Sequence, residues 1–198
     1  MVSKGDATRR TILETALGLA SELGLEGLTI GTLAKQVGMS KSGLYAHFAS
    51  KEVLQCAVLD TAAASFVDAV LAPAFKAPRG VPRVRAMHDR WIVWATELMP
   101  GGCPFVAAAT ELDDRPGPAR DALVGHMRDV LDAIERAAGI AVREGHFHES
   151  LDTSQFAYEF WANLVSYHHY VRLLRAEAAP ERARLALEGL LQRASTSP

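Results

Sequence analysis

The sequence has only two cysteines among its 198 residues, Cys56 and Cys103. Two thiols cannot build the disulfide framework of a small secreted domain, so we interpret both as reduced thiols. The first ten residues are polar, and the apolar stretch from residue 98 to 112 is broken by prolines and glycines. We therefore expect a cytoplasmic protein with neither a signal peptide nor a membrane span.

The sequence also lacks a large excess of charge of one sign. It has 21 Lys and Arg residues and 23 Asp and Glu residues, which gives a net charge of −2. This balance argues against a protein that coats nucleic acid with its whole surface. The two parts of the chain differ slightly: residues 1–54 hold six basic and five acidic residues, net +1, and the rest holds 15 and 18, net −3. The sign of this difference fits a chain in which only the N-terminal part contacts phosphate.

Alternating strand patterns are absent as well, whereas hydrophobic residues recur with the helical period almost everywhere. We therefore predict an all-α fold of nine helices. Their approximate ranges are 7–23, 30–37, 41–47, 51–75, 83–98, 105–112, 116–144, 153–176 and 180–193.

The most informative segment is LTIGTLAKQVGMSKSGLYAHFASK, residues 28–51. Thr29 and Ser40 are suited to cap two short helices, and Gly38 lies at the turn between them. The small side chain of Ala34 lets the two helices cross closely. This pattern predicts a helix-turn-helix.

The outward residues of the second short helix suit a DNA surface. A lysine reaches phosphate or a guanine edge, small residues permit close approach to bases, and tyrosine and histidine can hydrogen-bond phosphate oxygens. A lysine beside the N-terminus of the next helix is a further phosphate candidate. The candidates are Lys41, Ser42, Gly43, Tyr45, His47 and Lys51.

These residues resemble the DNA-binding signature of the TetR family, and the resemblance covers about the first quarter of the chain. It rests on Leu28-Thr29-Ile30, Leu33-Ala34, Val37-Gly38-Met39-Ser40, Gly43-Leu44-Tyr45-Ala46-His47-Phe48 and Lys51-Glu52. The resemblance implies a DNA-binding domain over residues 1–50 and a helical regulatory and dimerisation domain over 51–198. It also implies a homodimeric repressor that a small molecule releases from operator DNA, with Thr29 and Ser40 joining the six DNA contacts above.

The rest of the chain resembles the family in helix order and length, with a weaker likeness at Gly102-Cys103-Pro104-Phe105. Aromatic and polar residues of this part can line an effector pocket, although residue by residue a plain hydrophobic core explains them equally well. The candidate ligand contacts are His88, Trp91, Trp94, Phe105, Glu111, Phe160, Asn163, Tyr167 and His168. The candidate dimer contacts on the last two helices are Leu164, Val171, Leu174, Leu187 and Leu190.

Other functions remain open from the residues alone. Cys103, at a turn before a helix, suits a thiol sensor or a packed thiol. The adjacent His168 and His169 face different sides of a helix, so they are poor partners for one metal ion. A helical enzyme or a protein-interaction module is the remaining alternative, but no catalytic motif is visible, and we expect no metal, no cofactor and no catalytic residue.

Overall fold

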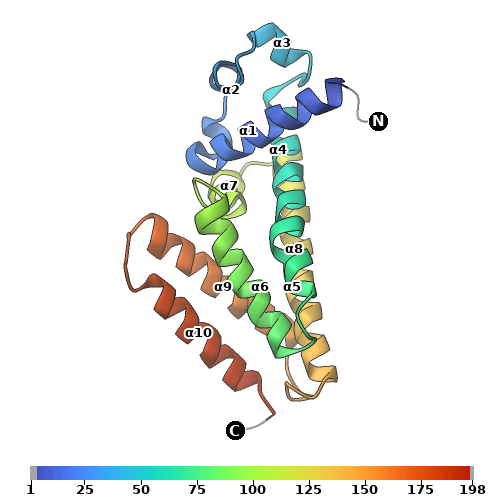
Figure 1. Ribbon diagram of the computed structural model, residues 1–198, viewed down its shortest axis with the longest axis vertical. Coiled ribbons are helices and arrows are strands. Elements are labelled where there is room, and N and C mark those ends of the chain that lie inside the picture. Colours follow the sequence, from blue (N-terminus) through green and yellow to red (C-terminus); the bar gives the residue numbers. More distant parts are fainter. Residues whose placement is uncertain (1–3, 197–198) are drawn as a thin grey trace. The chain divides into compact units, whose positions relative to one another are not determined.

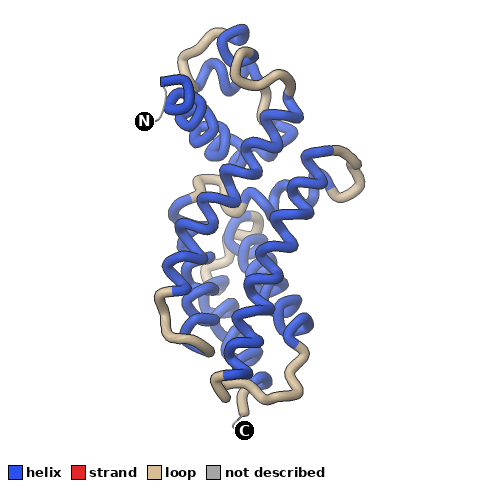
Figure 2. Tube along the Cα trace, turned by 90° about the vertical axis from the view of Figure 1, so that its right-hand side faces the viewer, coloured by secondary structure: helices blue, strands red, loops and turns tan. Residues whose placement is uncertain are grey.

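The computed structural model describes residues 4–196, and this part of the chain is helical without a strand (Figure 2). The all-α prediction is confirmed. The helices are α1 (Lys4–Gly27), α2 (Ile30–Gln36), α3 (Lys41–Tyr45), α4 (Lys51–Phe66), α5 (Ala72–Phe75), α6 (Val81–Val93), α7 (Pro104–Leu112), α8 (Pro118–Arg143), α9 (Thr153–Arg172) and α10 (Ala179–Ala194). Two π-helical turns, η1 (Val67–Leu71) and η2 (Trp94–Leu98), follow α4 and α6 directly.

The chain forms two compact units. The first contains the residues up to Ser65 together with Ala95–His126, and the second contains Phe66–Trp94 together with the residues from Met127 onward. The predicted domain boundary at residue 50 is a different division of the chain and stays a prediction.

In the first unit, α1 packs against α2 and α7. The regular helix breaks at Gly24, whose φ of 76° lies in the left-handed region, where we expected α1 to end. The glycine turn before α7 approaches α1 closely: a Cβ on Gly101 would lie 1.8 Å from the main-chain oxygen of Ser21. The Gly101 N–H donates to the Ser21 hydroxyl at 2.9 Å. Because a Cβ would collide with the main chain of α1, only glycine fits this position.

In the second unit, α9 and α10 run side by side, and α6 also packs against α9 (Figure 1). Asp152 caps α9 by accepting hydrogen bonds from the N–H groups of Ser154 and Gln155 at 3.0 and 2.9 Å. Aromatic residues fill the core. The Trp91 ring meets those of Trp161 and Tyr167 edge to face, with ring centres 6.1 and 6.4 Å apart.

The continuous helical run Lys51–Phe75 is long and apolar enough, by length and composition only, to cross a membrane. The expectation that no segment crosses a membrane stays a prediction, because length and composition alone do not decide it. Buried residues recur at every fourth position of the run: Leu54, Val58, Ala62, Phe66, Val70 and Ala74. One buried face is typical of a helix that packs in a protein core, and core helices pass the same test.

Candidate DNA-binding and effector sites

Helix α2 begins with a reciprocal cap between two threonines. The Thr29 hydroxyl accepts a hydrogen bond from the Thr32 N–H at 3.1 Å, and the Thr29 N–H donates to the Thr32 hydroxyl at 3.1 Å. Two of the N–H groups that a helix start leaves unpaired are thereby satisfied. The cap orients α2 but also occupies the Thr29 hydroxyl, a predicted DNA contact.

The turn between α2 and α3 depends on Gly38, whose φ is 67°. Its geometry lets the Met39 N–H donate to the Ala34 carbonyl at 2.9 Å, closing the end of α2. Ser40 then caps α3 by accepting from the Gly43 N–H at 3.1 Å. A Cβ on Gly43 would lie 3.2 Å from the Ser40 Oγ, so glycine at this position leaves the cap undisturbed.

Buried apolar residues hold α2 and α3 in place. Leu33, Leu44 and Phe48 are fully buried, and Ala34 is nearly so. The Arg9 guanidinium lies over the Phe48 ring, 5.0 Å from its centre, and links α1 to the residues after α3. The predicted helix-turn-helix core is therefore present, with α3 ending at Tyr45 rather than at residue 47.

The outer surface of α3 carries most of the predicted DNA contacts. Lys41 and Ser42 are exposed, and Tyr45 exposes 53% of its surface although it is a large aromatic residue. The Lys41 side chain runs over Gly31, where a Cβ would approach its Cε to 3.4 Å. His47 is half-buried, with its ring 6.4 Å from that of Phe48.

Lys51 differs from the other predicted contacts because its ammonium already has partners. It donates to the main-chain oxygen of Glu26 at 2.9 Å and to the Glu26 carboxylate at 3.1 Å. Gln55 donates to the same carboxylate at 3.1 Å. Hydrogen bonds from Lys51 and then Gln55 lower the pKa of Glu26 below its ordinary value, against a smaller opposing effect of burial.

Seven of the nine predicted effector contacts lie in the second unit. Among them His88 is buried, and Asn163 lies within hydrogen-bond distance of its Nε2 at 3.3 Å while donating to the Ala183 carbonyl at 3.0 Å. Burial lowers the pKa of His88, and the Asp89 carboxylate partly opposes this. These polar atoms join α6, α9 and α10, so their visible role is structural.

Two other predicted contacts have buried polar atoms without a hydrogen-bond partner among residues 4–196: the indole nitrogen of Trp91 and both ring nitrogens of His168. Burial, then the charges of His169 and Arg172, lower the pKa of His168 to about 4. Trp91 and Phe160 line a narrow apolar cavity that has room for about one water molecule. An effector that entered this cavity would have to displace side chains.

The other two predicted effector contacts, Phe105 and Glu111, belong to the first unit and are not part of this core. The Glu111 carboxylate accepts a hydrogen bond from the Glu26 N–H at 3.1 Å and covers Gly24, where a Cβ would lie 1.7 Å from it. Glu111 thus fastens α7 to the end of α1. The sequence offered no signal for this contact, because 85 residues separate the two partners.

The thiol and metal alternatives find little support in the geometry. Cys103 is completely buried, and burial raises the pKa of its thiol to about 12, so that the unreactive protonated form prevails. In the described part of the chain, no three His, Cys, Asp or Glu residues are grouped so as to hold a metal ion.

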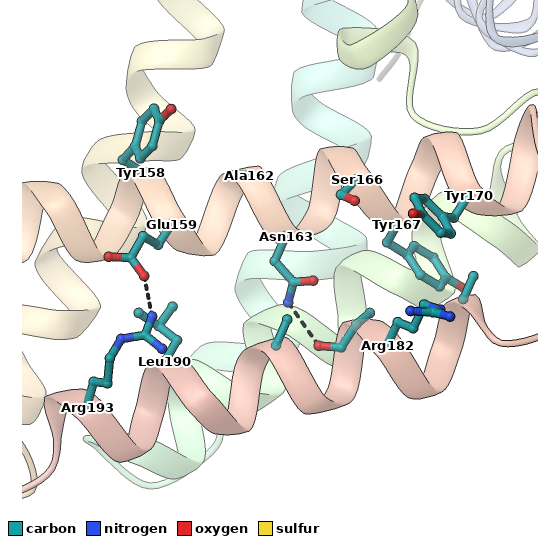
Figure 3. Close-up of a pocket in the computed structure, with 13 residues that line it drawn as sticks. Tyr158, Glu159, Ala162, Asn163, Ser166, Tyr167, Tyr170, Arg182, Leu190 and Arg193 are labelled. Atoms are coloured by element: carbon teal, nitrogen blue, oxygen red, sulfur yellow. Dashed lines mark hydrogen bonds and ion pairs between the residues drawn. The ribbon is translucent and has the colours of Figure 1, made fainter.

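The last two helices border a groove of about 470 Å³ (Figure 3). On α9 an exposed stripe follows every fourth position: Tyr158, Ala162, Ser166 and Tyr170. Opposite it, α10 presents Arg182, Ala186 and Arg193, the last paired with Glu159. This stripe was not predicted from the sequence, although its four-residue spacing is visible there.

Of the five predicted dimer contacts, Leu190 alone lines this groove, and Leu174 follows the end of α9. Leu164, Leu187 and Leu190 are buried within the chain itself, which leaves them little surface for a partner, whereas Leu174 exposes 58% of its surface and Val171 is half-buried. Their role in a dimer remains a prediction.

Comparisons with known proteins agree with this architecture. The family described as "Tetracyclin repressor-like, C-terminal domain" matches residues 80–187, and "Bacterial regulatory proteins, tetR family" matches residues 12–58. A 46-residue segment is 41% identical to the tetracycline repressor protein class C of Escherichia coli; it covers 23% of this chain and about a fifth, 21%, of that protein.

Two solved structures show the same fold over nearly the whole chain. A TetR transcriptional regulator from Chloroflexus aurantiacus superposes with a TM-score of 0.84 at 24% identity, covering 96% of this chain and 94% of that one. AibR, solved in complex with isovaleryl coenzyme A and operator DNA, gives a TM-score of 0.70 at 23% identity over 93% and 96% of the two chains. Because one family model alone matches more than half of the sequence, the chain belongs to the TetR family of bacterial transcription regulators.

Proposed function

We propose that this chain is a cytoplasmic, homodimeric repressor that binds operator DNA through α3 and leaves it when a small-molecule effector binds the second unit. The observation that carries the proposal is the pair α2 and α3, capped at both starts and joined through Gly38, with Lys41 and Tyr45 exposed on α3. An exposed lysine and tyrosine on a rigidly held short helix suit the major groove.

The DNA surface is expected to include Thr29, Ser40, Lys41, Ser42, Gly43, Tyr45 and His47, whereas Lys51 contributes by fixing the base of the helix-turn-helix through Glu26. Ser40 and Thr29 contribute mainly by fixing the helix starts, because their hydroxyls already accept hydrogen bonds from main-chain N–H groups. Lys41 supplies the positive charge, and the small residues Ser42 and Gly43 let the helix approach the bases.

A homodimer would present two such helices to successive major grooves, roughly 34 Å apart on a palindromic operator. The groove between α9 and α10 supports dimerisation, because its floor includes Ala162, Ala183 and Ala186. Small residues let a partner helix pack closely, and the two tyrosines at the rim, Tyr158 and Tyr170, supply apolar area.

Release requires an effector with different affinities for the DNA-bound and the free conformation. We place the effector in the core of the second unit, near Trp91 and His168, whose buried polar atoms have no partner there. A buried unpaired polar group costs roughly 1–3 kcal/mol. A ligand that satisfies such a group gains this stabilisation only in the state where the cavity is open.

The test is a gel-shift titration of the purified chain with DNA from its own promoter region across a salt series. Specific binding should weaken steeply with salt, and Lys41→Ala and Tyr45→Ala should abolish or strongly weaken it. Lys76→Ala, which removes an exposed lysine of the second unit, should bind like the unmodified chain.

Equal binding by all four proteins would contradict the assignment of α3 as the recognition helix. Absence of binding in every salt and ligand condition would favour a helical enzyme or an interaction module instead.

A further inference from the structure

A second open groove in the second unit lies between the end of the long helical run, the start of α6 and the middle of α8. It has a volume of about 490 Å³, within the range of roughly 300–1,000 Å³ that is typical of small-molecule sites. Its apolar wall includes Leu71, Phe75, Ala133 and Ile140. None of the predicted effector or dimer contacts lines it.

The charged residues of this groove are two arginines and one aspartate, Arg83, Arg136 and Asp129, so its net charge is positive. The Arg83 guanidinium is held in place, because its terminal nitrogen donates to the carbonyls of Phe75 and Ala77 at 3.1 Å each. The central carbon of the Arg83 guanidinium lies over the Phe75 ring, 5.7 Å from the ring centre.

Both arginines retain capacity for an anion. The Nε of Arg83 is buried and has no acceptor among the described residues, and an anion reaches it when the atoms that cover it move aside. No carboxylate of residues 4–196 lies within ion-pair distance of either guanidinium. Asp129 precedes Arg136 by two helical turns. Among the described residues that line the groove, it is the only acidic one.

We propose that this groove binds a small amphipathic carboxylate, with its anionic head on Arg83 and Arg136 and its apolar body along Leu71, Ala133 and Ile140. An arginine already fixed by two carbonyls binds a carboxylate at little cost in side-chain entropy. The apolar wall supplies the burial that a simple anion such as phosphate would not use. Nothing in the proposal depends on DNA.

The experiment is isothermal titration calorimetry of the full chain with sodium octanoate and, in parallel, with 1-octanol. Octanoate should bind at one site per chain with a dissociation constant on the order of 0.1 mM, and the uncharged alcohol should bind roughly tenfold or more weakly. Arg136→Gln should weaken octanoate roughly tenfold, because it removes one charge-assisted partner while keeping the side-chain length.

The matched control is Arg128→Gln, which changes an exposed arginine two turns earlier on α8 that does not line the groove. It should leave octanoate binding unchanged, and both variants should keep the circular-dichroism spectrum of the unmodified chain.

Three results would overturn the proposal: no octanoate binding at about 10 mM, equal affinity for octanol and octanoate, or equal losses in the two variants. The readout is binding alone, so it remains decisive whether or not the chain proves to be a repressor.

Discussion

The Lys51 ammonium donates to both the main-chain oxygen and the carboxylate of Glu26, and so ties the start of α4 to the end of α1. Arg115 adds a second cation, 3.5 Å from the same carboxylate. A lysine held in this way fixes the base of the helix-turn-helix. Its charge is shared with Glu26 and is therefore less available to phosphate than that of Lys41.

This difference predicts how operator binding responds to salt. Each phosphate contact adds about one to the slope of log affinity against log salt. We expect Lys41→Ala to reduce the slope by about one, and Lys51→Met to leave it unchanged while lowering the free energy of unfolding by at most about 1 kcal/mol, as for other exposed ion pairs. Filter-binding titrations and urea unfolding measure the two quantities. If Lys51→Met reduced the slope as much as Lys41→Ala, Lys51 would be a phosphate contact after all.

If the groove between α9 and α10 is the dimer interface, a bulky substitution in it should separate the two chains. Ala186 is exposed on the chain itself but lines the groove, so Ala186→Arg should leave the fold intact and block a partner helix. Size-exclusion chromatography with light scattering should show a shift from twice the chain mass to the chain mass. Ala64→Arg, at an exposed alanine of α4 in the first unit, is the control and should remain dimeric. A dimer that survives Ala186→Arg would place the interface elsewhere.

The buried thiol of Cys103 predicts resistance to alkylation. With its pKa raised to about 12, almost none of this thiol is thiolate at pH 8. In a Cys56→Ser variant, iodoacetamide should label Cys103 only as fast as the chain unfolds, and mass spectrometry after timed quenching measures that rate. Rapid labelling under native conditions would revive the thiol-sensor alternative. The converse variant, Cys103→Ser, reports the reactivity of the half-buried Cys56.

The helix-turn-helix could be predicted from sequence because its signals are local. Thr29 caps α2, Ser40 caps α3, and Gly38 turns between them, all within twelve residues. Each signal depends on main-chain geometry that neighbouring residues determine. The boundaries were less predictable: α3 ends at Tyr45, two residues before the predicted end.

The effector region could not be predicted in the same way, because its contacts join residues far apart in the chain. Burial of Trp91 and Phe160 is consistent with either a core or a pocket, and Glu111 accepts a hydrogen bond from the Glu26 N–H near the end of α1. Likewise Leu187 and Leu190 have the helical spacing of an interface, but both side chains are buried within the chain itself. Periodicity identifies the apolar face of a helix, and only the packing decides whether a neighbour in the same chain covers it.

The buried His168 predicts that the second unit loses stability in mild acid. Its pKa is lowered from 6.5 to about 4 by burial and by the charges of His169 and Arg172, so between these pH values the unfolded chain binds a proton that the folded chain does not. The contribution of the neutral His168 to the free energy of unfolding is therefore complete above pH 6.5 and falls as the pH drops towards 4. At about 1.4 kcal/mol per pKa unit, the loss would be roughly 3 kcal/mol.

Urea unfolding between pH 7 and 4.5 should therefore give a shallower pH dependence for His168→Leu than for the unmodified chain. The control is His148→Leu, which removes a histidine that precedes the start of α9, whereas His168 lies near the end of that helix. Parallel curves for His168→Leu and the unmodified chain would mean that His168 is hydrated in solution. The proposed effector site would then lose one of the unpaired buried groups on which it rests.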